Sequence, residues 1–133
     1  MLLDSSFVID LFEGLRGARE VAEELDQTGE VLKLPAPSMF ELWVGAGRAL
    51  RSREETARLE ALALAYEVVA FDAGDARQAG ALQVILSKEG RSLGTVDVQL
   101  AGMCLARDEV VLTRDRLLSG LGHGVRTRTY NRA

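Results

Sequence analysis

Four acidic residues stand at the ends or openings of the regular segments that the sequence predicts. Asp4 ends a short apolar run, and Asp115 lies two residues beyond another such run, 109–113. Asp97 and Glu41 each fall in the first turn of a segment with helical spacing. If the apolar runs are parallel strands, all four acids meet at the carboxyl edge of one sheet, where such folds place their ligands.

Carboxylates that converge repel one another, and at least one would be driven neutral unless a cation joins them. Mg²⁺ and Mn²⁺ are hard ions that bind carboxylates and water and take further oxygens from a substrate phosphate. One or two such ions can activate a water molecule and stabilise the leaving oxygen in phosphodiester hydrolysis. The four acids therefore predict a magnesium or manganese site, and this chemistry needs neither histidine nor cysteine.

Each acid also has a purely structural interpretation. Asp4 could cap the helix that follows it, and Glu41 could close a capping box with Ser38. Asp97 could complement a helix dipole, and Asp115 could be a turn residue. One shared site explains four acids at one edge more simply than four separate caps do, and both interpretations stay open at this point.

The elements that must position these acids are short apolar runs alternating with longer segments of helical spacing. Strands separated by helices need crossover connections, which predict a mostly parallel sheet. We therefore expect an α/β fold of three layers, with four or five strands flanked by helices. The expected strands are 1–3, 30–35, 67–71, 109–113 and 125–130; the expected helices are 7–12 with Ser5 or Ser6 as its cap, 16–28, 38–49, 54–66, 75–89 and 95–107, and a short apolar turn follows at 117–121.

Length and composition bound the class of protein. With 133 residues, 47% of them hydrophobic and 27% charged, the chain predicts one globular domain over 1–133. The net charge of −4 argues against coating nucleic acid by bulk charge, although a nuclease that meets phosphate through metal ions stays compatible. One histidine and one cysteine exclude an ordinary structural zinc site. The lone thiol, together with no signal peptide or membrane span in the sequence, predicts a cytoplasmic protein.

The acids and their neighbours resemble the motifs of the PIN-domain family, and within it the VapC toxins of VapBC toxin–antitoxin pairs. The run 3–11 (LDSSFVIDL) is similar to the opening of the family, and 38–42 (SMFEL) resembles its second motif. The run 94–101 (GTVDVQLA) resembles the third motif, and 112–115 (LTRD) the fourth. The resemblance covers essentially the whole chain, and it lies in the order and spacing of the motifs, because each motif alone is common.

The resemblance implies metal ligands at Asp4, Glu41, Asp97 and Asp115. It implies an endoribonuclease that depends on one or two Mg²⁺ or Mn²⁺ ions, a homodimer and a cognate VapB-type antitoxin. An arginine or lysine of the antitoxin would block the acidic cleft by pairing with its carboxylates. Thr113 is the implied polar support near the metal.

Neighbouring residues carry further expectations. Ser5 is a candidate supporting residue beside the acids. Arg114 and Arg116 flank the last acid and are candidate phosphate contacts, with a solvated turn as the alternative. Phe40 and Trp43 are expected in the core, with a dimer or antitoxin contact as the second interpretation of Trp43.

The sequence departs from the usual family pattern at two places. Leu118 stands where an aromatic residue is common, and Gly102 ends a run that often reads Ile-Ala-Ala. We expect both to be packing changes with a small cost in core volume. Neither departure touches an acid.

Two alternative functions are open to the sequence. The chain could be a PIN-like protein-binding module whose acids are only caps, in which case alanine at Asp97 would leave RNA cleavage unchanged and cost about 0.5–2 kcal/mol. It could also be another PIN nuclease, acting in RNA processing or on structured DNA. A neighbouring gene for a DNA-binding antitoxin would favour the toxin.

Overall fold

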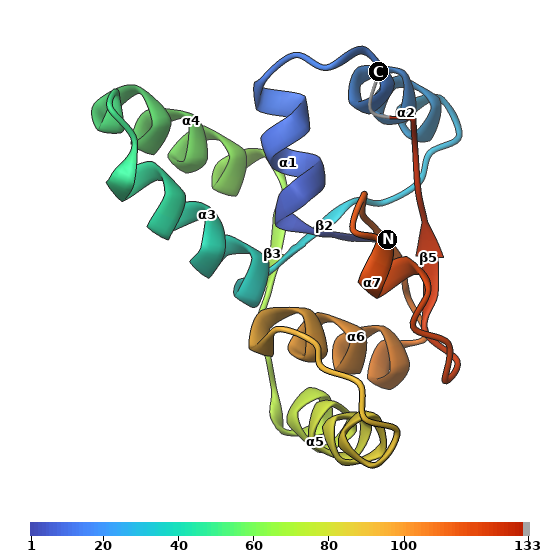
Figure 1. The fold of residues 1–133 in the computed structure, drawn as a ribbon. Helices are drawn as coiled ribbons and strands as arrows, with labels where there is room; N and C mark the ends of the chain where they lie inside the picture. The colour runs from blue at the N-terminus through green and yellow to red at the C-terminus, as the bar shows by residue number, and fades with distance from the viewer. Residues whose placement is uncertain (132–133) are drawn as a thin grey trace.

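The computed structural model describes residues 1–131 and confirms a three-layer α/β architecture around a five-stranded parallel sheet (Figure 1). The strand order is β3-β2-β1-β4-β5, and every neighbouring pair is parallel. The strands are β1 (Leu2–Leu3), β2 (Lys33–Pro35), β3 (Glu67–Val69), β4 (Val110–Leu112) and β5 (Arg126–Arg128); the helices are α1 (Ser5–Phe12), α2 (Arg16–Gln27), α3 (Ala36–Arg48), α4 (Ser52–Ala65), α5 (Ala73–Lys88), α6 (Thr95–Arg107) and α7 (Arg116–Ser119).

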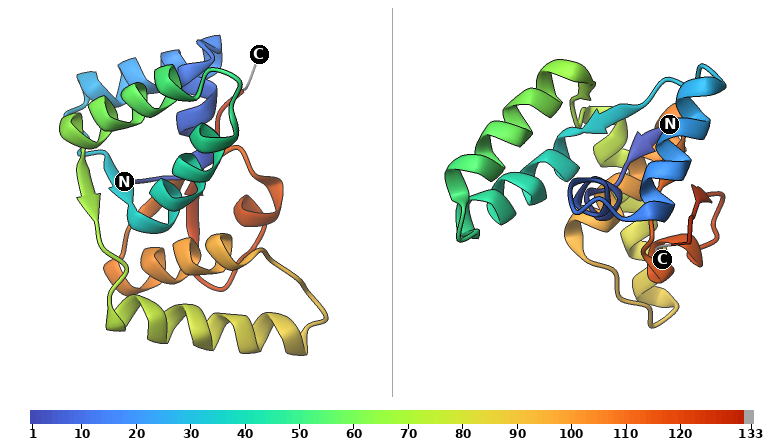
Figure 2. Two further views of the ribbon diagram at one scale, coloured as in Figure 1. Left: turned by 90° about the vertical axis from the view of Figure 1, so that its left-hand side faces the viewer. Right: turned by 90° about the horizontal axis from the view of Figure 1, so that it is seen from above.

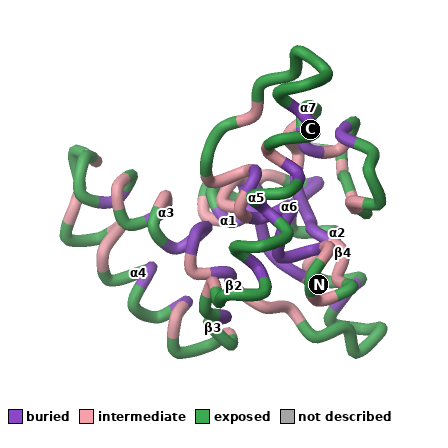
Figure 3. The backbone as a smooth tube through the Cα atoms, turned by 90° about the horizontal axis from the view of Figure 1, so that it is seen from below, coloured by how far each residue is buried: buried purple, intermediate pink, exposed green. Residues whose placement is uncertain are grey.

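The two faces of the sheet carry separate cores because successive side chains of a strand point to opposite faces. Leu3 and Leu112 belong to a cluster with α1, α2, α3 and α4. Leu2 and Val111 belong to a second cluster with α5, α6 and α7. Figure 2 shows α5 and α6 running side by side on their own face of the sheet. Buried residues concentrate around the sheet, whereas the outer end of the α3–α4 pair is exposed (Figure 3).

The chain first winds outward from β1 to β3 and then returns to the other side of β1. Strand order therefore reverses between β1 and β4, which pair in the register Leu2 with Val111 and Leu3 with Leu112. At such a reversal the connections leave in opposite directions and open a crevice at the carboxyl ends of the strands. The segments that follow β1 and β4 contain Asp4 and Asp115.

The expected order of elements is confirmed, but the N-cap residue of α1 differs from the prediction, and α1, α3, α4 and α5 each begin two residues earlier than expected. Asp4, and not Ser5 or Ser6, is the N-cap residue of α1. Helix α3 begins at Ala36, two residues earlier than expected, with Pro37 in its first turn. Proline suits that place because its fixed φ matches the helix and its missing N–H has no partner to lose there.

Two expected core aromatics are exposed. Phe40 is 62% exposed and Trp43 is 39% exposed, one turn apart on α3. The prediction of core packing is wrong for both, because α3 turns Leu42 and Ala46 to the core instead. Leu118, at the position where the family often has an aromatic residue, is fully buried in the core around α6.

Candidate active site

The structure places the four acids on four different elements around the point where strand order reverses. Asp4 follows β1, Asp115 caps α7 after β4, and Asp97 comes from the first turn of α6. Glu41 lies in the second turn of α3 and not in the first as expected, because α3 begins at Ala36. The charges of neighbouring acids act on the pKa values of Asp97 and Glu41, which places the four acids in one region. Burial raises the pKa of Asp97 to about 6, with further contributions from the charges of Asp4, Asp115 and Glu41. Burial also raises the pKa of Glu41, as do the charges of Asp4 and Asp115, against a hydrogen bond from Ser5 that lowers it.

Asp4 is the most closely held of the four acids, because it is buried and accepts two hydroxyl hydrogen bonds on one oxygen. Thr113 Oγ1 donates to Asp4 Oδ2 at 2.6 Å and Ser6 Oγ donates to the same atom at 2.7 Å. Asp4 occupies the N-cap position of α1, but its side chain makes no cap hydrogen bond, so capping does not account for the carboxylate. These bonds orient one oxygen of Asp4 and leave the other to the site.

The fully buried Thr113 ties the first acid to the last. Its hydroxyl donates to Asp4 and accepts from the backbone N–H of Asp115 at 2.9 Å. Asp115 Oδ1 caps α7 through the N–H of Leu117 at 2.8 Å, so the structural interpretation of Asp115 holds for that oxygen. Thr113 thereby fixes the position of Asp4, which follows β1, relative to Asp115, which precedes α7.

Glu41 takes a hydrogen bond from across the site and not from its own helix. Ser5 Oγ donates to Glu41 Oε1 at 3.0 Å, from the start of α1 to the start of α3. The capping box between Ser38 and Glu41 does not form: Pro35 is the N-cap residue, and the buried Ser38 hydroxyl has no hydrogen-bond partner among the described residues. Ser5 thus has the contact that its candidate supporting role requires, while Ser6 beside Asp4 is a contact that the sequence prediction missed.

The two arginines that flank Asp115 have different surroundings. Arg116 is exposed at the start of α7. Arg114 Nε lies 2.9 Å from Oδ2 of the fully buried Asp10, which also accepts a hydrogen bond from the Tyr130 hydroxyl at 2.6 Å. Arg114 therefore contacts a carboxylate on α1, far earlier in the chain. The spacing of residues in the sequence does not predict this contact.

The donor set suits a hard divalent ion, and no protein cation competes for it. Within residues 1–131, no lysine, arginine or histidine forms an ion pair with Asp4, Glu41, Asp97 or Asp115. No three acidic, histidine or cysteine residues of the described chain already stand at the spacing of one ion. Charged carboxylates repel one another, and a bound cation would relieve that repulsion. The chemistry of the donors fits the ion, and rotation of their side chains must complete the ligand geometry.

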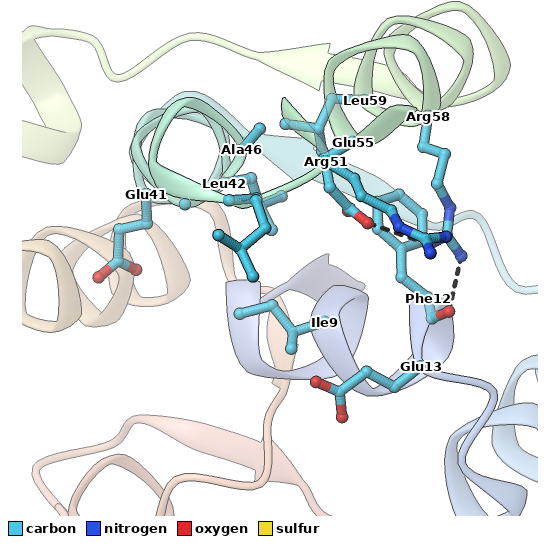
Figure 4. Close-up of a pocket in the computed structure, with 13 residues that line it drawn as sticks. Ile9, Phe12, Glu13, Glu41, Leu42, Ala46, Arg51, Glu55, Arg58 and Leu59 are labelled. Carbon is cyan, nitrogen blue, oxygen red and sulfur yellow. Dashed lines mark hydrogen bonds and ion pairs between the residues drawn. The ribbon is translucent and has the colours of Figure 1, made fainter. Parts of the chain in front are cut away.

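A groove leads away from Glu41 between α1, α3 and α4 (Figure 4). Its volume is about 530 Å³, and apolar side chains such as Ile9, Leu42 and Leu59 line its middle. Glu41 lies at one end and Arg58 at the other, where Arg58 donates to the Phe12 carbonyl at 2.6 Å and stacks on the Phe12 ring. The acidic site thus opens directly onto an apolar surface.

The sequence matches the PIN domain family over residues 1–123, and the chain belongs to that family. The resemblance to the PIN-domain family, which implied the metal ligands, is thereby confirmed at the level of the family. A comparison with curated protein sequences gave no match. No described helix combines the length and the apolar character that crossing a membrane would need.

Solved structures with a similar fold include members of toxin–antitoxin systems. The chain is similar to one in VapBC2 from Rickettsia felis bound to a promoter DNA fragment, with a TM-score of 0.88, 14% identity and 98% of each chain covered. It is similar to one in DNA-bound VapBC from Salmonella typhimurium, with a TM-score of 0.85, 21% identity and 96% of each chain covered. For VapBC-5 from Mycobacterium tuberculosis the TM-score is 0.72 at 24% identity, over 96% of this chain and 94% of that one. These likenesses establish the fold.

Proposed function

We propose that this chain, as one PIN domain over 1–133, is a metal-dependent endoribonuclease and the toxin of a VapBC-type toxin–antitoxin pair. One observation carries the proposal: four carboxylates from separate elements share the point where strand order reverses and have no protein cation to neutralise them. Caps alone do not explain them, because only Asp115 makes a side-chain cap bond. The cytoplasm, where RNA and a partner protein meet, is the proposed location.

Asp4, Glu41, Asp97 and Asp115 would hold one or two Mg²⁺ or Mn²⁺ ions. A bound divalent ion of this kind supplies an activated water and stabilises the leaving oxygen in phosphodiester hydrolysis. Thr113 and Ser6 orient Asp4 through one oxygen, and Ser5 orients Glu41. Asp97, half-buried among three other acids, is the group whose charge is hardest to maintain without an ion.

The RNA substrate would meet the site at its rim. Arg116 is exposed beside Asp115 and is the proposed phosphate contact. Arg114 stays a candidate for the same role, although the structure pairs it with Asp10. RNA, and not DNA, is chosen on the resemblance to the VapC toxins.

A cleavage assay tests the nuclease proposal. Purified protein is incubated with a panel of structured RNAs in Mg²⁺ or Mn²⁺, beside EDTA and the variants Asp97→Asn and Asp108→Asn. Asp108 is a matched control because it is an exposed acid that pairs with Arg126 outside the cluster. We expect cleavage by the wild type and Asp108→Asn, and its loss in EDTA and in Asp97→Asn. Cleavage that survives in Asp97→Asn would contradict the proposed site.

The proposed antitoxin segment is an apolar stretch that lies in the α1–α3–α4 groove and ends in an arginine or lysine. The groove supports this occupant because its apolar middle leads to Glu41, so a cation at the end of the segment would reach the carboxylates. Ile9→Glu places a charge in the groove, and Val84→Glu places one on an exposed site of α5. When each variant is expressed with the protein encoded by the adjacent gene, only Ile9→Glu should lose the complex.

A second copy of the chain is the proposed partner of the exposed aromatics on α3. Phe40 and Trp43 lie one turn apart and outside the groove lining. We expect Phe40→Glu to convert a dimer to a monomer in light scattering, whereas Leu64→Glu, at an apolar site on α4 that is 90% exposed, should leave the dimer intact. A wild type that is monomeric at high concentration would contradict the homodimer.

A further inference from the structure

Asp10 is a buried carboxylate that the proposed nuclease chemistry does not use. It lies on α1, is fully buried, and has a charged neighbour in Arg114 and a hydroxyl donor in Tyr130. Burying a carboxylate is costly unless a charge or hydrogen bonds compensate it. Helix α1 could carry an apolar residue such as leucine at this position, but it carries Asp10. The partners of Asp10 include Arg114, on the β4–α7 connection, and Tyr130, near the end of the chain.

Arg114 stands directly beside the proposed ligand Asp115, between it and Thr113. Its backbone N–H donates to Ser6 Oγ at 3.3 Å, and Ser6 in turn donates to Asp4. Its side chain instead turns toward α1, where the buried Nε lies 2.9 Å from Asp10 Oδ2 without the alignment of a hydrogen bond. The interaction is therefore an ion pair between buried atoms, next to the acidic cluster and directed away from it.

Tyr130 fixes the other partner of this ion pair. Its hydroxyl donates to the same Asp10 oxygen at 2.6 Å, and its ring packs edge-on against Phe7 with the ring centroids 5.5 Å apart. The Asp10 carboxylate is thus held by a side chain that is itself held in the core. These contacts of Tyr130 keep the Asp10 carboxylate in its place on α1.

We propose that Asp10 is a positioning residue for the acidic site: with Tyr130 it holds the Arg114 guanidinium out of the carboxylate cluster, so that the cluster keeps its negative charge for a divalent cation. This inference rests on the proposed metal site. Without Asp10, the long Arg114 side chain would be free to turn to the cluster, since Asp115 is its neighbour in sequence and Ser6 links its backbone to Asp4. The arginine would then compete with the ion for the same oxygens.

Mn²⁺ affinity, measured by calorimetric titration, tests the proposal in four proteins: the wild type, Asp10→Asn, Arg114→Gln and the double variant. Asp10→Asn should weaken Mn²⁺ binding at least about tenfold, the size of effect that a nearby unit charge produces close to a protein surface. Arg114→Gln alone should bind within about threefold of the wild type or more tightly. In the double variant, affinity should return to within about threefold of the wild type, because the competing cation is gone.

The rescue separates positioning from a structural role. If Asp10 only supported the fold, removing Arg114 as well would not restore Mn²⁺ binding, and that result would overturn the proposal, as would wild-type affinity in Asp10→Asn. Asp108→Asn is the matched control, because it breaks an exposed aspartate–arginine pair, 2.7 Å from Arg126, and should leave affinity unchanged.

Two further outcomes are informative. If Asp10→Asn fails to fold by circular dichroism, Tyr130→Phe replaces it: loss of one hydrogen bond to Asp10 should weaken Mn²⁺ binding about threefold, and adding Arg114→Gln should abolish that loss. Unchanged affinity in Tyr130→Phe would then overturn the proposal. A wild type that binds no Mn²⁺ would overturn the metal site itself, which distinguishes that failure from a failure of Asp10 alone.

Discussion

Asp97 is the acid at which burial and repulsion act most strongly together. Its pKa lies near 6 in the folded chain, against an ordinary value of 3.8. Between these two values the folded protein binds more protons at this residue than the unfolded chain does. Because stability falls with rising pH wherever the folded state holds the extra proton, Asp97 destabilises the metal-free protein progressively as pH rises from about 4 through 6.

Replacing Asp97 by asparagine should therefore stabilise the metal-free protein. At pH 8 in EDTA we expect Asp97→Asn to raise the free energy of unfolding by about 1–2 kcal/mol, after allowance for solvent screening of a half-buried group. The difference from the wild type should shrink toward zero as pH approaches 4. Denaturant unfolding at pH 5 and pH 8 measures the difference in unfolding free energy and its decrease at lower pH. Asp108→Asn is the control, and its unfolding free energy should not rise. A destabilised Asp97→Asn at pH 8 would indicate a structural role for the carboxylate.

Thr113 should show the opposite behaviour, because its hydroxyl satisfies two other groups. Thr113→Val keeps the shape but removes the donor to Asp4 and the acceptor for the Asp115 N–H. We expect a loss of about 1–3 kcal/mol in unfolding free energy and weaker Mn²⁺ binding. Thr113→Ser keeps the hydroxyl and should retain Mn²⁺ binding despite the lost methyl group. Equal Mn²⁺ affinity in Thr113→Val and the wild type would contradict a supporting role.

At the residue scale, the sequence predicted where the acids would lie, and the resemblance implied Thr113 as a support, but the individual hydrogen bonds were not predicted. Acids after apolar runs fall at the carboxyl edge of a parallel sheet whatever the strand order, so their placement follows from local pattern. The bonds from Thr113 to Asp4 and from Tyr130 to Asp10 join residues 109 and 120 positions apart. Periodicity carries no information about such pairs, and only the folded chain reveals them.

At the scale of elements, hydrophobic spacing predicted every strand and every helix except α7, which was expected as a short apolar turn. The other errors lie at the ends of the elements. The strand expected over 67–71 ends at Val69, and α3 begins at Ala36 before the expected Ser38. The hydrophobic pattern indicates which face of an element is buried. The first and last residues of the element depend on hydrogen-bond partners that the rest of the fold supplies to the backbone. At the start of α5 these partners are local, because Asp72 and Asp75 supply both reciprocal capping bonds.

The close approach of α5 and α6 depends on Gly102, and here the expectation of a small cost in core volume is wrong. A Cβ at Gly102 would lie 2.6 Å from both the Cβ and the backbone nitrogen of Ala79. The helices are therefore packed backbone against backbone, with no cavity at this position. Glycine permits the contact that an alanine, common here in the family, would prevent unless α5 moved.

Gly102→Ala should destabilise the fold for this reason. Pressing a methyl group into a packed helix contact costs about 1–3 kcal/mol, and we expect that loss in denaturant unfolding. Gly80→Ala is the matched control in α5, since no atom lies within 4 Å of its added Cβ, and it should stabilise the protein by about 0.5–1 kcal/mol. A neutral Gly102→Ala would mean that α5 shifts freely on α6.

At the scale of the whole molecule, the strand order β3-β2-β1-β4-β5 brings the acids together. The reversal between β1 and β4 places the first motif beside the last, while α3 and α6 approach the same edge from opposite faces of the sheet. Local pattern predicted a parallel sheet but not this order, since strand pairing is decided by contacts between segments distant in the chain. The site is therefore a property of the complete fold and not of any one motif.

An ion bound to all four elements should consequently stabilise the molecule as a whole. At a Mn²⁺ concentration one hundred times the dissociation constant, binding to the folded state alone adds about 2.7 kcal/mol. For a chain of this size that corresponds to a rise in melting temperature of about 10 °C. Hydrogen exchange should slow together in α3, α6 and the residues after β1 and β4, because opening any of them releases the ion. Asp97→Asn should lose most of the rise, and an unchanged melting temperature in the wild type would contradict a site shared by the four acids.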